Sequence, residues 1–281
     1  WRHTYEVFVR AVSSDLVLML TPENIRPRFV RQPDGTYVNT DYPAYRGARL
    51  TRNPDGTTTL RYKDGMVWTF NGAGWLIRQA DRNGNTVLIL RDSQNRVTSV
   101  VDPAGRSLTF SYSGSDLKVQ QVTDPLGRTV QYTYDGSSRL IRVTDPAGGT
   151  WQYTYDAQGR LATITDPRGI VTEQNTYDSS GRVIQQVLAD GGTFQISYQV
   201  TAGTVTGVTV TDPNGNRTTY RLTGGKFLSE TTDSLGQTTQ TPRATASNLI
   251  SSRTDALGRE TRYIYDGNGN VTSITDPLGN V

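Results

Sequence analysis

The sequence repeats itself at a fixed interval of 21 or 22 residues. The four-residue pattern Asp-Pro-x-Gly occurs six times among the 281 residues, and three weaker copies, DRNG, DSLG and DALG, keep the same spacing. One longer interval of 46 residues spans two units. The nine copies begin at Asp81, Asp102, Asp124, Asp145, Asp166, Asp212, Asp233, Asp255 and Asp276. Because a repeat of fixed length indicates one small structural unit stacked many times, this interval constrains the fold more than the overall composition does.

A second pattern lies out of phase with the first. It is a Tyr-Asp pair followed by Gly or Ser, then Arg or Asn, then Leu or Val. The clearest copies begin at Tyr134, Tyr155, Tyr177 and Tyr265. Two patterns in every 21 residues predict two turns per repeat.

The segments between the two patterns alternate in polarity. In residues 128–135, RTVQYTYD, the side chains of Val130, Tyr132 and Tyr134 fall on one face and the intervening polar residues on the other. A period of two with β-branched and aromatic residues is typical of a half-buried strand. Turn signals this dense leave no room for a helix, so each repeat is predicted to be a β-hairpin.

The residues of both patterns suit turns. In residues 145–148, Pro146 presets φ for the second position of a turn, Asp145 accepts backbone hydrogen bonds, and Gly148 tolerates a positive φ. We therefore interpret these residues as structural and not catalytic. The predicted turn residues are Asp102, Pro103, Gly105, Asp124, Pro125, Gly127, Tyr134, Asp135, Asp145, Pro146, Gly148, Tyr155, Asp156, Gly159, Asp166, Pro167, Gly169, Tyr177, Asp178, Gly181, Asp212, Pro213, Gly215, Tyr265, Asp266, Gly269, Asp276, Pro277 and Gly279.

The predicted fold is all-β. A hairpin cannot bury its own apolar face, so neighbouring hairpins are expected to pair edge to edge. A sheet of about twenty strands rarely stays flat, and we expect a long curled or spiral sheet that encloses a space. Residues 1–66 keep the β character but lose the clean period, whereas residues 67–281 carry the repeats. The prediction is one continuous architectural unit with a divergent N-terminal segment.

Five large aromatic residues stand out in the first third of the chain. They are Trp1, Phe8, Phe29, Trp68 and Trp75. Because terminal units of repeat proteins are atypical, we interpret these residues as core anchors or as a plug for the first turn of the sheet. A surface for binding sugars is the alternative.

Composition argues against several other functions. The 29 basic and 26 acidic residues are interspersed, which does not favour nucleic-acid binding. No apolar stretch is long enough for a membrane span. The absence of cysteine excludes disulfides and thiolate metal sites.

We predict no enzyme, no cofactor and no metal. The only histidine is His3, so a histidine relay lacks its residues. The glutamates lie in unlike contexts that favour solvation over a catalytic pair, namely Glu6, Glu23, Glu173, Glu230 and Glu260. Residues 266–270, DGNGN, mimic the start of an EF-hand, but Val271 and Pro277 occupy the positions that require Gly and Glu.

The two patterns, as in YDAQGRL and VTDPLGRTVQYTYD, resemble the YD repeats of the Rhs family, which also occur in teneurins and in toxin-complex C components. The resemblance is strong over residues 67–281. It implies a strip of β-hairpins wound into a hollow shell, which in bacterial members encloses a C-terminal toxin.

The resemblance stops short of the motif at which Rhs shells release their toxin. That motif has a Pro where this sequence has Val271, and a Leu where it has Asn280. We therefore expect Asp276 to be an ordinary turn residue without self-cleavage. The sequence is expected to be an N-terminal portion of a larger shell.

Two functions from different classes follow. The first is a structural shell segment of a secreted protein, or of one delivered by a bacterial secretion system, that surrounds a passenger polypeptide. The second is an extracellular adhesion module that binds carbohydrate or protein. The expected partners are the rest of the same shell and its passenger.

An open sheet edge can recruit a second chain, so we expect this fragment to self-associate. Light scattering across a concentration series measures this, and a strict monomer at every concentration would contradict it.

Overall fold

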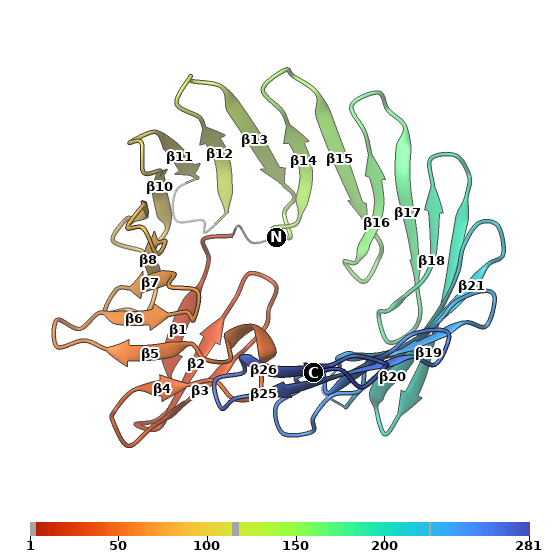
Figure 1. Ribbon diagram of the computed structural model, residues 1–281. Coiled ribbons are helices and arrows are strands. Elements are labelled where there is room, and N and C mark those ends of the chain that lie inside the picture. Colours follow the sequence, from red (N-terminus) through yellow and green to blue (C-terminus); the bar gives the residue numbers. More distant parts are fainter. Residues whose placement is uncertain (1–3, 114–117, 225) are drawn as a thin grey trace. The chain divides into compact units, whose positions relative to one another are not determined.

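The computed structural model describes residues 4–113, 118–224 and 226–281 and is all-β over them. It contains 26 strands in one antiparallel sheet and a single 3-10 turn, Pro43–Tyr45. The prediction of an all-β fold made of repeated antiparallel hairpins is confirmed (Figure 1). The chain divides into two compact units. Unit 1 comprises the residues up to Tyr132 with Gly267–Asn270, and unit 2 comprises Thr133–Asp266 with Val271–Val281. The boundary expected at residue 66 stays a prediction.

The strands of unit 1 are short in its first half and lengthen where the repeats begin. They are β1 (Phe8–Ala11), β2 (Leu16–Leu20), β3 (Arg28–Arg31), β4 (Tyr37–Val38), β5 (Arg49–Arg52), β6 (Thr58–Arg61), β7 (Val67–Phe70), β8 (Leu76–Ala80), β9 (Thr86–Arg91), β10 (Val97–Val101), β11 (Ser107–Tyr112), β12 (Val119–Thr123) and β13 (Thr129–Tyr134), whose last two residues belong to unit 2. Each of these strands pairs with the next in the chain. Such pairing requires only short turns.

Unit 2 repeats the same arrangement with longer strands. They are β14 (Leu140–Thr144), β15 (Thr150–Tyr155), β16 (Leu161–Thr165), β17 (Val171–Tyr177), β18 (Val183–Leu188), β19 (Thr193–Thr201), β20 (Thr204–Thr211), β21 (Arg217–Leu222), β22 (Leu228–Thr232), β23 (Thr238–Gln240), β24 (Ser252–Thr254), β25 (Glu260–Tyr265) and β26 (Val271–Thr275). They also pair in chain order. Two strands and two turns therefore account for each period of about 21 residues.

Unit 1 rolls back on itself through β1. One edge of β1 pairs with β2. At its other edge, the N–H of Val9 donates to the carbonyl of Gly74 at 2.8 Å, and the N–H of Leu76 donates to the carbonyl of Val7 at 3.1 Å. A Cβ on Gly74 would lie 2.1 Å from the carbonyl oxygen of Val9, so only glycine permits this approach.

This closure encloses a hydrophobic core within unit 1. Its largest fully buried side chains include Phe29, Phe70, Met19, Leu50 and Leu60. The predicted anchor Phe29 thus lies in the core. The other predicted aromatic anchors are Phe8, Trp68 and Trp75, which are half-buried, and Trp1, which lies outside the described residues.

Unit 2 has a different interior. Among its described residues, Leu140 is the one hydrophobic side chain that is buried. The cross-strand register places polar residues together on one face, as in the row Ser197, Thr209, Thr219 and Thr232. The neighbouring row on the opposite face holds Tyr198, Val208 and Tyr220, and all three are half-buried.

The core of unit 1 predicts a large effect for truncation of Phe29. Phe29→Ala is expected to lower the free energy of unfolding by about 3–5 kcal/mol, because it removes a fully buried aromatic side chain and leaves a cavity. Chemical denaturation followed by tryptophan fluorescence measures the change. Leu126→Ala is the control, since Leu126 is 79% exposed and should change stability by no more than about 0.5 kcal/mol. Equal effects of the two substitutions would contradict the core assignment.

Candidate functional site

Most turns of the two repeat patterns share one backbone geometry. At residues 102–106, the N–H of Gly105 donates to the carbonyl of Asp102 at 3.0 Å, and the N–H of Asp102 donates to the carbonyl of Arg106 at 2.9 Å. The loop thus has three residues, and Gly105 takes the left-handed conformation with φ of 80°. This is the three-residue hairpin loop that ends in a left-handed residue.

The carboxylate of the aspartate that opens this turn accepts hydrogen bonds from within the turn. One carboxylate oxygen of Asp102 accepts from the N–H groups of Ala104 and Arg106, each at 2.9 Å. The other oxygen accepts from Nε of Arg106 at 2.7 Å. The carboxylate therefore fixes the turn and the arginine together.

The structure places the sequence-predicted residues in or next to these turns. Asp, Pro and Gly of the first pattern occupy the turns that follow even-numbered strands from β10 to β16, and those after β20 and β26. The tyrosines Tyr134, Tyr155, Tyr177 and Tyr265 are the last residues of their strands, and each is followed by its turn aspartate. The glycines Gly159, Gly181 and Gly269 are left-handed, with φ of 77°, 78° and 79°. The structure brings these residues together as turns and not as one convergent cluster.

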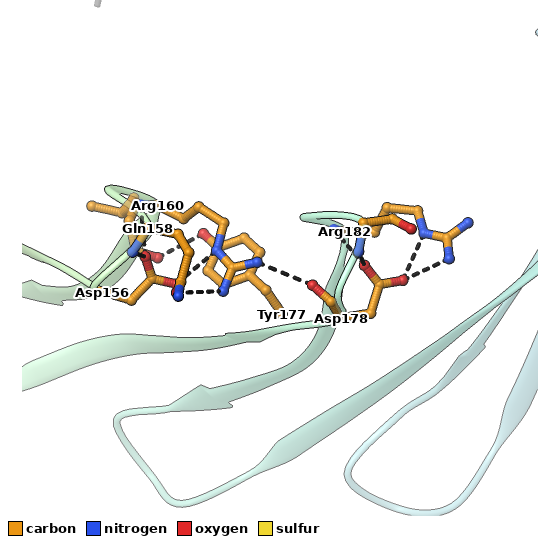
Figure 2. Close-up of polar contacts among 8 residues, drawn as sticks. Asp156, Gln158, Arg160, Tyr177, Asp178 and Arg182 are labelled. Carbon is orange, nitrogen blue, oxygen red and sulfur yellow. Dashed lines mark hydrogen bonds and ion pairs between the residues drawn. The ribbon is translucent and has the colours of Figure 1, made fainter.

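In part of the sheet, a tyrosine and an arginine connect one hairpin to the next, as Figure 2 shows for Arg160 and Tyr177. Nε of Arg160 donates to the carboxylate of Asp156 at 2.7 Å, and the guanidinium lies 4.6 Å from the ring centroid of Tyr177. The hydroxyl of Tyr177 donates to the carbonyl of Leu161 at 2.6 Å. Nη1 of Arg160 also donates to the carbonyl of Asp178 at 3.0 Å, and Asp178 opens the turn between β17 and β18. We call this arrangement the tyrosine–arginine clasp.

The clasp recurs along the sheet. Its other copies join Arg96 with Tyr112, Arg139 with Tyr155, and Arg182 with Tyr198, at 4.9, 4.9 and 4.8 Å from guanidinium to ring centroid. In each copy the tyrosine hydroxyl donates to a backbone carbonyl at 2.6–2.9 Å. Cation–π contacts of this kind contribute about 0.5–2 kcal/mol each, more when they are shielded from water. The sequence showed an arginine after several of the turns, but it did not show that this arginine reaches the next hairpin.

The turn hydrogen bonds shift the titration of the aspartates. The backbone N–H of Arg182 holds the pKa of the Asp178 carboxyl below its usual value, and the N–H of Arg160 does the same for the pKa of Asp156. Burial raises the pKa of the Tyr177 hydroxyl. Both effects preserve the clasp at neutral pH, with an ionised carboxylate and a protonated phenol.

The clasp has no geometry suited to bond breaking. Its carboxylates already accept several hydrogen bonds, and its tyrosine hydroxyls donate to backbone carbonyls. Among the described residues, no three His, Asp or Glu side chains gather as metal ligands. No helix within these same ranges is long and apolar enough to cross a membrane.

The other residues that the sequence offered as candidates take part in separate local contacts. Glu230 forms an ion pair with Arg221, Glu260 forms one with Arg262, and Glu173 accepts from the amide of Asn175. Residues 266–270 form the turn between β25 and β26. His3 lies outside the described residues.

Comparison with protein families identifies the repeats. The family model described as RHS Repeat matches residues 115–150, 134–171, 155–193 and 245–281. The prediction of Rhs-type repeats is confirmed. A comparison with curated proteins found no match.

Several solved structures match the chain at low sequence identity. TcdB2-TccC3 without its hypervariable C-terminal region is 12% identical, with a TM-score of 0.48, and the match covers 96% of this chain and 20% of that one. TcdB2-TccC3-Cdc42 is 13% identical, with a TM-score of 0.44, over 90% of this chain and 18% of that one. The Tc holotoxin pore of Photorhabdus luminescens is 13% identical, with a TM-score of 0.43, over 93% and 18%. The chain spans about a fifth of the length of these matched chains.

One turn tests the need for a left-handed residue. Ser138 has a φ of 60° at the position that glycine occupies in the turns at Gly159 and Gly181. Ser138→Gly is expected to raise the free energy of unfolding by roughly 1 kcal/mol, because the left-handed conformation is strained for a residue with a Cβ. Gly159→Ala should lower it by a similar amount. Thermal denaturation of both variants measures this, and a loss of stability in Ser138→Gly would contradict it.

Acid should weaken the turns. The pKa values of Asp135, Asp156 and Asp178 are lowered in the folded protein, so folding favours their ionised forms. Their contribution is complete above the unfolded pKa of about 3.9 and is lost as pH falls through the folded values. We expect the melting temperature to fall between about pH 5 and pH 2. Asp178→Asn should reduce this fall, and a melting temperature independent of pH over the range would contradict the account.

Proposed function

We propose that this chain, in which residues 115–193 and 245–281 match the RHS repeat, forms part of the wall of a hollow β-shell that surrounds a passenger polypeptide. The RHS repeats and the all-β hairpin fold support a structural role in such a sheet. We propose further that the sheet curls, that it encloses a passenger, and that the protein is released from the cell.

The clasp is the observation that carries this proposal. It connects successive hairpins through side chains at their turns, so the row of turns is stiffened from one hairpin to the next. Among the described residues of unit 2, Leu140 is the one buried hydrophobic side chain. A stiffened sheet one layer thick is suited to a wall, whereas a catalytic or globular domain needs a packed interior.

The proposal has consequences for partners. The rest of the shell is expected to continue the sheet through strand pairing, since the backbone of an edge strand is a template for another strand. The passenger is expected to contact the wall as an enclosed polypeptide. Adhesion through carbohydrate or protein binding is the second candidate, and a pocket in unit 1 favours it.

Protease protection tests encapsulation. In the complete protein that contains this chain, the passenger should resist proteinase K, whereas the same segment expressed alone should be digested, because the wall excludes the protease. Gel electrophoresis and mass spectrometry of the time course measure the difference. Equal rates of digestion would contradict encapsulation.

Variants of the clasp refine this experiment. A double substitution, Arg139→Gln with Arg160→Gln, should make the passenger more sensitive to the protease. Arg142→Gln is the matched control, because Arg142 is an exposed arginine of β14 that takes no part in a clasp. Protection that is equally weakened in the control would show that the clasp has no special part in the wall.

A further inference from the structure

A small pocket in unit 1 lies where β1 meets two hairpin turns. The turns are residues 53–57, between β5 and β6, and residues 71–75, between β7 and β8. The pocket has a volume of about 270 Å³. This is just below the roughly 300–1,000 Å³ of sites for drug-sized ligands, so it suits a small molecule.

Two arginines supply the charge of this pocket. Arg10 comes from β1 and Arg52 from the end of β5, and both line the pocket. Within the described residues, neither side chain has a hydrogen bond or ion pair, unlike the arginines of the turns. No Asp or Glu lines the pocket. The nearby Asp55 is held within its own turn, where its carboxylate accepts from the N–H and hydroxyl of Thr57 at 2.9 and 2.6 Å.

The remaining lining combines an aromatic ring with neutral polar groups. Phe8 lines the pocket and packs against Trp75 with 4.9 Å between ring centroids. The guanidinium of Arg91 lies 5.1 Å from the Trp75 ring centroid, so Trp75 contacts both the Phe8 ring and Arg91. Asn53, Thr57 and Thr58 complete the lining. The amide nitrogen of Asn53 already donates to the hydroxyls of Thr57 and Thr59, each at 2.8 Å, which leaves its amide oxygen and the Thr58 hydroxyl as polar groups for a ligand. The contact with Trp75 orders the Phe8 ring before any ligand arrives.

We propose that this pocket binds an anionic hexose, with the phosphate or carboxylate of the sugar held by Arg10 and Arg52. Guanidinium groups form charge-assisted, often bidentate hydrogen bonds with both kinds of anion. The Phe8 ring offers an apolar surface to the C–H face of the sugar, and the amide oxygen of Asn53 and the hydroxyl of Thr58 suit its hydroxyl groups. The proposal rests on unit 1 alone and does not depend on encapsulation.

Calorimetric titration tests this assignment with four probes: glucose 6-phosphate, glucuronate, glucose and inorganic phosphate. At least one of the two anionic sugars should saturate the protein in the range of about 1 mM or below, and more tightly than glucose or inorganic phosphate. Saturation by glucose 6-phosphate alone would assign a phosphate, and saturation by glucuronate alone would assign a carboxylate. Quenching or enhancement of tryptophan fluorescence would give a second readout, since Trp75 lies against Phe8.

Matched variants identify the site. Arg10→Gln and Arg52→Gln should each weaken binding by roughly tenfold, because each removes one charged donor. Arg61→Gln is the control, as Arg61 is an exposed arginine of β6 outside the pocket. Circular dichroism verifies that all three variants fold. Absence of saturation, equal affinity for inorganic phosphate and the anionic sugars, or equal weakening in Arg61→Gln would overturn the proposal.

Discussion

The hydrogen bonds of the turn aspartates are the interaction on which the rest of this structure depends. A carboxylate such as that of Asp156 accepts from two backbone N–H groups and from the side chain of Arg160. The backbone bonds set the loop length and thereby the strand register. The side-chain bond aims the guanidinium at Tyr177 in the next hairpin. A local turn motif thus becomes a contact between hairpins.

The two units of this chain are stabilised in different ways. In unit 1, short strands and the approach of β1 to Gly74 enclose a core around Phe29 and Leu60. In unit 2, longer strands form a sheet whose apolar face is only half-buried. Hydrophobic burial is therefore concentrated in unit 1, whereas strand pairing, turns and clasps hold unit 2 together.

The proposed wall and the proposed ligand pocket depend on different parts of the chain. A sheet stiffened by clasps suits a wall, because its hairpins need no second layer to keep their order. The closed core of unit 1 supports a rigid pocket edge, with Phe8 held against Trp75. Binding residues are commonly carried on loops that a rigid scaffold positions, and the turns beside β1 fit that pattern.

The sequence by itself determined the turns, the alternation within each strand and therefore the all-β hairpin class, because a turn needs only five neighbouring residues such as 102–106. It could not determine which rows of side chains align across strands, since register depends on pairing between separate segments. Tertiary structure alone decided that Arg160 reaches Tyr177, that β1 closes on Gly74, and that Arg10 and Arg52 share a pocket. These contacts join segments that are distant in the chain, and local patterns carry no record of such distances.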